Sequence, residues 1–314
     1  MPGASLIAAS ALAATGLLCL WLQRGALRGT TLLAPWCWSV VSLVALTSAE
    51  LAAAFSTSAG DPTTTALRYV AAMSTFCPLM ALLGAKRPQD AGWQFIVLSL
   101  WVVLALPGLE WLLFGGVQEL HPARVAFLVL LIAIGAINGV GTRLMPASLL
   151  FAAGQGALVA PFLGLEQASS AREWLPPAGM AALVASWAVA TARRIVSQAP
   201  RPLDRVWLDF RDAYGLVWSL RAMERVNATG KLCMWPTRLG WRGFYRVDSP
   251  LPSQPGDDLN EATLAAVVET LRTLLRRFVS AAWIENRLGS LEKSSARAGQ
   301  DETASVSGAE KSAP

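Results

Sequence analysis

The sequence has little charge for its length and a single histidine. Only 15% of its 314 residues are charged and 54% are hydrophobic, whereas soluble globular chains carry about 25% charged residues. This composition excludes an ordinary cytosolic enzyme. With His121 as the one histidine, the chain by itself cannot form a bis-histidine haem site, a histidine-rich metal site or an HExxH motif. We therefore expect no cofactor and no metal.

Cysteine and lysine are also scarce. The four cysteines include no CxxC pair, and Cys19, Cys37 and Cys77 fall in apolar runs, so no disulfide framework is predicted. Lysine occurs four times and arginine 22 times, a bias that indicates a GC-rich bacterial genome. The chain has no P-loop, nucleophile elbow or metal-ligand spacing, and catalysis is therefore not favoured.

The few charged residues are unevenly placed. Residues 1–192 hold eight Lys and Arg and seven Asp and Glu, whereas residues 193–291 hold 15 and ten. We predict an all-α protein with a polytopic membrane helical bundle in residues 1–194 and a small, mainly helical cytoplasmic domain in residues 195–291. Residues 292–314 have one valine as their only larger aliphatic residue, so they are predicted to be a disordered tail.

Seven apolar segments, bounded by charged residues, Pro or Gly, divide the first part. They cover residues 5–22, 32–55, 67–85, 93–114, 124–141, 145–165 and 176–192. A span needs about 20 apolar residues, and each must be helical because hydrocarbon offers the backbone no hydrogen bonds. We predict about seven transmembrane helices, with six and eight as alternatives. The first segment lacks a preceding positive region and is interpreted as a retained span rather than a signal peptide.

Basic residues in the short connections set the orientation. With the N-terminus outside, seven Lys and Arg fall in cytoplasmic connections and three in outer ones. This favours an N-out, C-in topology. The sequence therefore predicts a multi-pass protein of the bacterial inner membrane, with a cytoplasmic C-terminus and the lipid bilayer as its first partner.

Ionisable residues near the outer ends of the spans form a candidate outer polar site. They are Glu50, Arg68, Glu110, His121 and Arg124. Such groups are costly in lipid unless they pair or face water. One hypothesis is a vestibule in which Glu50 pairs with Arg68 or holds a proton or cation. A structural ion pair, or snorkelling to the headgroups, is favoured over it. An intramembrane enzyme that also uses Asp61 is a weaker third alternative.

Small residues predict close helix packing. The candidate packing residues are Gly135, Gly139, Gly156, Ala160 and Gly164, the last three on a four-residue repeat that starts at Ala152. We expect Asn138 and Gln155, which lie beside these residues, to hydrogen-bond between helices rather than to bind a ligand. Pro78, Pro107 and Pro161 predict kinks in three of the spans.

Two amphipathic helices are predicted in the cytoplasmic part. The first covers residues 203–228, and the second starts at the capping box of Asp258 and Glu261 and continues to Gly289. Their apolar stripes form a candidate interface: Trp207, Phe210, Tyr214, Trp218, Leu271, Leu275 and Phe278. Packing of the two helices on each other is favoured. The alternatives are contact of the first helix with anionic lipid and a coiled coil of the second with another copy.

Between these helices, residues 231–248 interleave basic and aromatic side chains, a pattern that can bind nucleic acid. Residues 242–244 match the start of an RNP1 strand, but Tyr245 and Arg246 depart from it and no RRM-like order of elements surrounds it. We therefore predict a short hairpin or irregular segment packed between the helices, and no nucleic acid partner.

Two functions remain after these exclusions. The first is a membrane anchor or assembly component, whose cytoplasmic helices dock a protein partner or a second copy. The alternative is a transporter or small-molecule-binding membrane protein that uses the outer polar site around Glu50 and Glu110. The first function depends on residues 195–291, and the second depends on the two carboxylates.

Overall fold

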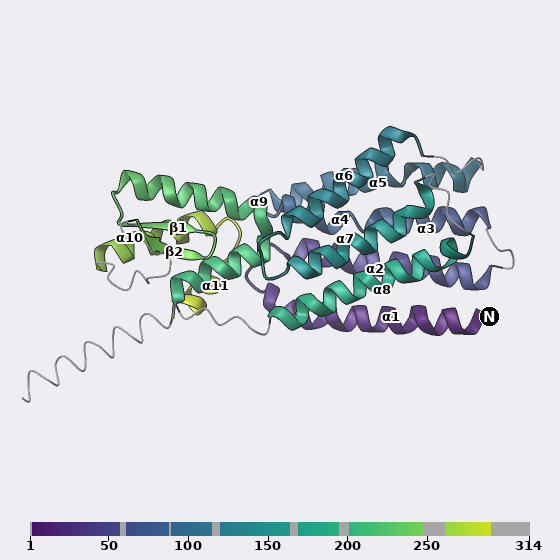
Figure 1. The fold of residues 1–314 in the computed structure, drawn as a ribbon, viewed down its shortest axis with the longest axis horizontal. Helices are drawn as coiled ribbons and strands as arrows, with labels where there is room; N and C mark the ends of the chain where they lie inside the picture. The colour runs from purple at the N-terminus through teal and green to yellow at the C-terminus, as the bar shows by residue number, and fades with distance from the viewer. Residues whose placement is uncertain are drawn as a thin grey trace, which may run out of the picture. The chain divides into compact units, whose positions relative to one another are not determined.

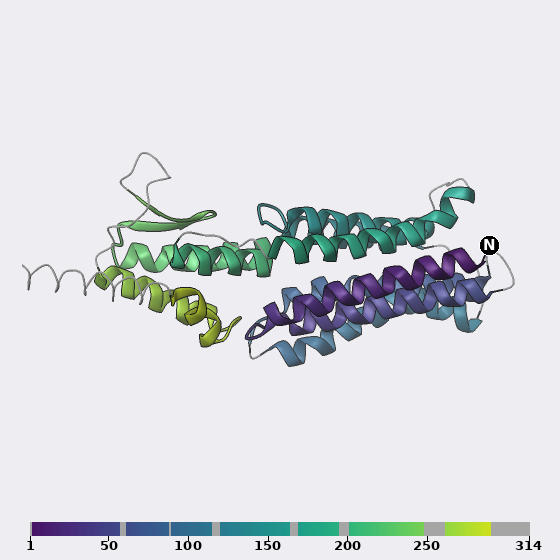
Figure 2. The same cartoon turned by 90° about the horizontal axis from the view of Figure 1, so that it is seen from below.

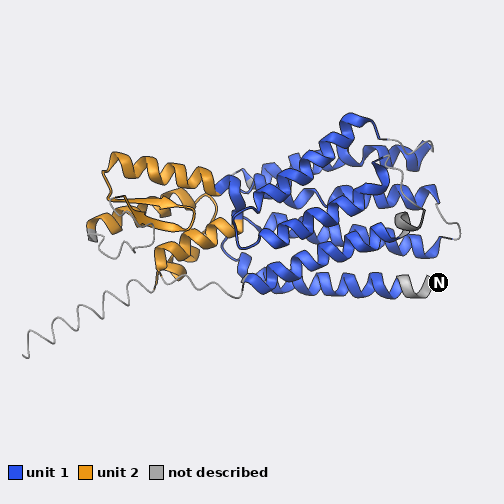
Figure 3. Ribbon diagram, in the orientation of Figure 1, with its two compact units in different colours: residues 1–196, 214–218 blue, residues 197–213, 219–314 orange. Residues whose placement is uncertain are grey.

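The computed structural model divides the chain into two compact units (Figure 3). The first, here called the bundle unit, comprises residues 1–196 together with 214–218; the second, the hairpin unit, comprises residues 197–213 and 219–314. The residues that the structure describes are 2–56, 61–87, 89–114, 120–163, 169–194, 201–247 and 261–289. The disordered tail predicted for 292–314 lies outside them.

The bundle unit consists of helices that run side by side and reverse direction at the connections (Figures 1 and 2). They are α1 (Pro2–Gln23), η1 (Arg24–Leu27), α2 (Leu33–Phe55), α3 (Pro62–Ser74), α4 (Cys77–Leu83), α5 (Asp90–Phe114), α6 (Pro122–Asn138), α7 (Met145–Val159), η2 (Ala160–Phe162) and α8 (Ser169–Arg194). Each of the seven predicted apolar segments therefore contains helix, with α3 and α4 sharing the third.

Six stretches in the described part of the chain are long and apolar enough to cross a membrane. They are Leu6–Leu27, Leu33–Phe55, Pro62–Leu83, Ala91–Phe114, Met145–Phe162 and Trp174–Arg193. Several such helices in one chain mark a membrane protein. The apolar helix α6 has 17 residues, which at 1.5 Å per residue is slightly short of the ~30 Å hydrocarbon layer.

The break between α3 and α4 follows from Pro78. This proline cannot donate to the Ser74 carbonyl four residues earlier, and the Ser42 hydroxyl of α2 donates to that oxygen instead, at 2.7 Å. The next carbonyl, of Thr75, accepts from the Gln155 side chain of α7 at 3.0 Å. Neighbouring helices thus satisfy the freed backbone groups, as apolar surroundings require, and the predicted interhelical hydrogen bond of Gln155 is confirmed.

The core of the bundle unit lies around α3. Tyr69 and Met73 are fully buried, and the Tyr69 ring contacts Trp111 and Phe162 at centroid distances of 5.0 and 5.1 Å. The Tyr69 hydroxyl donates to the Leu104 carbonyl at 3.0 Å, in the turn before Pro107, which remains inside α5. A buried tyrosine here combines aromatic packing with a partner for the backbone near the proline.

Within the described chain, the four-residue repeat predicted in α7 does not form a close helix contact at Gly156. Open space surrounds the position where a Cβ on Gly156 would lie, whereas a Cβ on Gly154 would lie 2.9 Å from the Gly179 carbonyl of α8. Helix α7 ends at Val159 and Ala160 begins η2, so the row does not continue on one helix face. Gly164 lies outside the described residues. The close approach of α7 and α8 therefore depends on Gly154 and Gly179.

The other two packing glycines lie against neighbouring side chains. A Cβ on Gly135 would lie 3.2 Å from the Leu79 side chain, and one on Gly139 would collide with Ser148. These two positions therefore permit close packing of α6 against its neighbours.

The hairpin unit contains most of one long helix, a hairpin and two shorter helices. These are α9 (Pro202–Leu232), β1 (Thr237–Gly240), β2 (Gly243–Arg246), α10 (Glu261–Leu275) and α11 (Ala281–Leu288). The strands are antiparallel, with Gly240 opposite Gly243, which confirms the predicted hairpin and makes the chain mainly rather than wholly helical. The second predicted helix is wrong as one element, because it is interrupted after Leu275 and Ser280 caps α11 by accepting from the Trp283 N–H.

The predicted interface residues of the hairpin unit lie in its core. Trp207, Phe210, Leu271, Leu275 and Phe278 are all buried, and the rings of Phe210 and Phe278 meet edge to face at 5.4 Å. This is the packing of the two helical segments on each other that the sequence favours. Since buried side chains cannot contact a partner, these residues are not an open docking surface. The described helix that carries Leu271 and Leu275 is α10, Glu261–Leu275, which has 15 residues or about two heptads.

Candidate functional site

The structure brings together two of the five predicted outer residues. Arg68 of α3 donates to both carboxylate oxygens of Glu50 in α2, through Nε at 2.9 Å and a terminal nitrogen at 2.8 Å. These two parallel hydrogen bonds engage both carboxylate oxygens of Glu50.

The remaining outer residues do not join this pair. Glu110 and His121 are exposed, and Arg124 is partly exposed. His121 caps α6 by accepting from the Ala123 N–H at 3.2 Å. Among the described residues, no hydrogen bond or ion pair links any of the three to Glu50 or Arg68, and no metal-binding cluster of His, Cys, Asp or Glu is found. Glu50 and Arg68 therefore form an isolated ion pair rather than part of an assembled polar site.

The most elaborate polar site lies where α9 is interrupted at Gly215. This glycine has φ 75° and ψ −170° within an otherwise helical segment, a conformation that side chains disfavour. A Cβ at this position would also collide with the side chain of Asn138, at the end of α6. Gly215 thus meets two requirements at once: a left-handed φ and a close approach to a neighbouring helix.

Residues 214–218, here called the docking segment, belong to the bundle unit. The Val217 N–H donates to the Asn138 side-chain oxygen at 3.2 Å, and the Trp218 indole N–H donates to the Leu82 carbonyl of α4 at 3.2 Å. The helical interruption removes the regular partner of the Val217 N–H. Asn138 therefore acts on it as a capping residue supplied by another helix.

Tyr214 joins the docking segment to two connections of the bundle unit. Its hydroxyl accepts from the Thr31 N–H at 3.3 Å and lies 3.1 Å from the Thr31 hydroxyl. The Thr31 hydroxyl donates to the Ala85 carbonyl at 2.6 Å, so in this arrangement the Tyr214 hydroxyl is the donor to Thr31. Burial raises the pKa of Tyr214 to about 12, and hydrogen bonding with the side chain and the backbone of Thr31 opposes this shift. The phenol is therefore neutral near pH 7.

The docking segment thus contacts three different connections of the bundle unit. Thr31 lies between α1 and α2, Leu82 and Ala85 lie where α4 leads to α5, and Asn138 lies where α6 leads to α7. The charge distribution predicts all three connections to be cytoplasmic. Thr31, Asn138 and Tyr214 are all buried, so the segment is packed into the bundle unit rather than resting on its surface.

The hairpin holds both halves of α9 within the hairpin unit. On the first half, Asp204 accepts from the Phe244 N–H at 2.8 Å and Arg211 donates to the Trp241 carbonyl at 2.8 Å. On the second half, the Asn227 amide both donates to and accepts from the Leu239 backbone, each at 2.8 Å. The hairpin therefore links the parts of α9 on either side of Gly215.

The end of α9 carries two exposed apolar side chains, Leu232 at 85% and Met234 at 89% exposure. Met234 is the one non-glycine residue of the described chain with positive φ, at 52°. The Trp235 N–H donates to the Gly230 carbonyl and the Met234 N–H to the Lys231 carbonyl, which defines a Schellman motif whose strained position usually holds glycine. The chain thus places an exposed methionine where glycine would relieve strain.

Two of these features escape pattern-based prediction. Gly215 lies inside a strongly periodic helical segment, where an isolated glycine is tolerated, and its partner Asn138 is remote in sequence. For the exposed side chains of Leu232 and Met234 at the end of α9, the only signal in the sequence is that the helical periodicity of apolar residues is lost there. Comparison with protein family models, curated proteins and solved structures finds no match, so the function has to be inferred from the site.

Proposed function

We propose that this protein is a multi-pass component of the bacterial inner membrane, with the N-terminus outside and the C-terminus in the cytoplasm, that anchors a protein assembly. In this proposal α6 completes seven spans, and the hairpin unit is the cytoplasmic part that binds the protein partner. The burial of Leu128 of α6 in the bundle core supports the seventh span. The excess of basic residues in the connections assigned to the cytoplasm supports the orientation.

The docking segment carries the proposal. Five residues of α9 belong to the bundle unit while the chain on both sides belongs to the hairpin unit. A flexible tether would require no buried hydrogen bonds, yet the segment uses Asn138, Thr31 and a main-chain carbonyl of α4 as partners. Each neutral hydrogen bond contributes about 0.5–1.5 kcal/mol. A segment held in this way resists displacement of α9, as an anchor requires.

The surface proposed to bind the partner is the end of α9, with Leu232 and Met234 at its centre. Two basic residues near them in the sequence, Lys231 and Arg238, are also exposed. Exposed apolar groups next to cations fit a protein with an apolar groove and an acidic rim, because charge complementarity favours encounter and orientation while apolar burial supplies affinity. We therefore propose an acidic protein partner rather than a second copy of this basic unit.

Site-specific photo-crosslinking in membranes tests this function. A photo-reactive amino acid at position 234 of the full-length protein should give one discrete adduct with an acidic protein. The same reagent at position 220, another exposed apolar site on α9, is the matched control and should not give that adduct. Arg238→Glu should weaken the adduct while the protein level stays unchanged. Adducts with lipid or with a second copy, or an adduct insensitive to Arg238→Glu, would contradict the proposal.

A transporter or small-molecule role around Glu50 and Glu110 has less support. Both oxygens of Glu50 accept from Arg68, so binding a cation or proton would have to break two charge-assisted hydrogen bonds. Glu110 is exposed, and within the described part of the chain it forms no hydrogen bond or ion pair with Glu50 or Arg68. The ion pair is better explained as a stabilising link between α2 and α3.

A further inference from the structure

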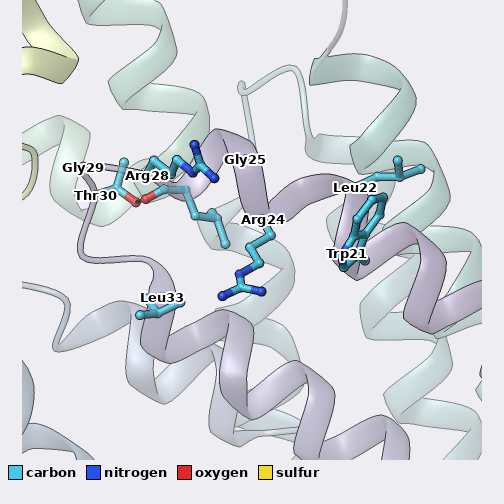
Figure 4. A pocket seen from close by; sticks show the side chains of 9 residues that line it. Trp21, Leu22, Arg24, Gly25, Arg28, Gly29, Thr30 and Leu33 are labelled. Atoms are coloured by element: carbon cyan, nitrogen blue, oxygen red, sulfur yellow. Dashed lines mark hydrogen bonds between the residues drawn. The ribbon is translucent and has the colours of Figure 1, made fainter.

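A cavity of about 700 Å³ lies at the connection between α1 and α2 (Figure 4). Its wall includes Trp21 and Leu22 of α1, Arg24 and Arg28 in and after η1, and Leu33 at the start of α2. Volumes of about 300–1,000 Å³ are typical of small-molecule sites. The cavity lies at the ends of two membrane-spanning candidates, where hydrocarbon gives way to headgroups.

The polar part of the cavity is cationic. Arg24 and Arg28 are both exposed, and within the described chain neither forms an ion pair with a carboxylate. Arg24 lies over the Trp36 ring, with its guanidinium carbon 6.0 Å from the ring centroid. The planar guanidinium group matches phosphate oxygens in pairs and is weakly hydrated. Two such groups at one cavity therefore fit a phosphate ester.

The remaining wall is apolar and open. Trp21 is 63% and Leu33 53% exposed, and Leu22 is likewise exposed on the same cavity. Tryptophan at the membrane interface packs its ring against the upper acyl chains and glycerol region. An anionic group next to an apolar surface is the arrangement of an acidic glycerophospholipid, whereas a free phosphate would leave the apolar wall unused.

The backbone leaves room for such a headgroup. Open space surrounds the position where a Cβ on Gly25 would lie, and Gly29 has φ 78°, a conformation that glycine adopts without strain. The Thr30 hydroxyl donates to the Leu27 carbonyl at 2.7 Å, which fixes the turn that carries Arg28.

We propose that this cavity binds the phosphate of an anionic glycerophospholipid, held by Arg24 and Arg28, with an acyl chain along Trp21 and Leu33. Zwitterionic lipids carry the same phosphate together with a cation, which the two arginines repel, so the site selects for net negative charge. The inference goes beyond the anchoring role and does not depend on the proposed protein partner.

Native mass spectrometry of the full-length protein in detergent tests the site with phosphatidylglycerol and phosphatidylcholine as probes. The protein should retain phosphatidylglycerol preferentially. Each substitution of Arg24 or Arg28 by Gln should weaken retention about fivefold, because a basic residue near an anionic surface contributes about 1 kcal/mol. The double variant Arg87→Gln/Arg143→Gln removes equal charge from two other connections and is the matched control; it should retain the lipid as the unchanged protein does.

Two further arms separate the lipid from a soluble phosphate. Trp21→Ala should weaken phosphatidylglycerol retention while it leaves any binding of inorganic phosphate unchanged, and thermal unfolding verifies that each variant is folded. Displacement of the lipid by millimolar inorganic phosphate would assign the cavity to a soluble phosphate and overturn the lipid proposal. Equal retention of both lipids, or full retention of phosphatidylglycerol by the folded Arg24→Gln/Arg28→Gln variant, would also overturn it.

Discussion

The side-chain oxygen of Asn138 accepts a hydrogen bond from the Val217 N–H at 3.2 Å, two residues after the glycine that interrupts α9. Asn138 ends α6, so the last residue of one helix caps the restart of another. The same side chain lies so close to Gly215 that a Cβ there would collide with it. Asn138 therefore caps the second part of α9, and its close approach requires glycine at position 215.

Gly215→Ala should destabilise the protein. Alanine would be strained at φ 75° and would displace Asn138, and non-glycine residues in sparsely populated conformations cost about 1–3 kcal/mol. Thermal unfolding in detergent should show a clear fall in the melting temperature. Gly92→Ala is the control, because open space surrounds that position within α5; it should leave the melting temperature unchanged or raise it. Equal effects of the two substitutions would contradict the role assigned to Gly215.

Stability should fall as pH rises from 10 to 12, partly because of Tyr214. Burial raises the pKa of this phenol from 10.0 to about 12. Between these values the unfolded chain has lost the Tyr214 proton while the folded chain retains it, so unfolding becomes more favourable as pH rises. The full difference is about 3 kcal/mol.

Tyr214→Phe should flatten this pH dependence. At pH 7 it should cost about 1 kcal/mol, because the Thr31 partner loses a hydrogen bond. Unfolding of both proteins measured at a series of pH values checks both effects. An identical slope above pH 10 for the two proteins would show that Tyr214 is not buried as described.

The Glu50–Arg68 pair should behave as a structural link. Glu50→Ala should lower the amount of protein in membranes, because it leaves a partly buried guanidinium without its partner. The swap Glu50→Arg/Arg68→Glu should restore much of that amount. If Glu50→Ala left the amount of protein in membranes unchanged, the two hydrogen bonds between Arg68 and the Glu50 carboxylate would not stabilise the packing of α2 against α3.

The sequence predicts the apolar helices well because their signal is local. Length, hydropathy and flanking charge locate every span candidate to within a few residues, and Pro78 marks the break between α3 and α4. The pattern does not show which face of a helix meets which neighbour. It thus favours the repeat through Gly156, whereas the close contact uses Gly154 and Gly179.

The candidate interface illustrates the same limit. An amphipathic stripe is equally typical of a core and of a partner surface, and Trp207, Phe210 and Phe278 turn out to be core. The sequence predicts a single helix up to Gly289 because its apolar periodicity continues past Leu275. In the structure the helix is interrupted there, and Ser280 caps the start of α11. The docking segment depends on Asn138, a partner from another helix that no local pattern identifies.

Hydrogen exchange of the Val217 amide in the full-length protein, reconstituted in lipid nanodiscs, tests the anchoring role of the docking segment most directly. We predict protection of this amide comparable to that of the bundle helices. In Asn138→Ala that protection should be lost, while the Leu239 and Phe244 amides of the hairpin, bonded within the hairpin unit, remain protected. Rapid exchange of the Val217 amide in the unchanged protein, or full protection in Asn138→Ala, would contradict the account.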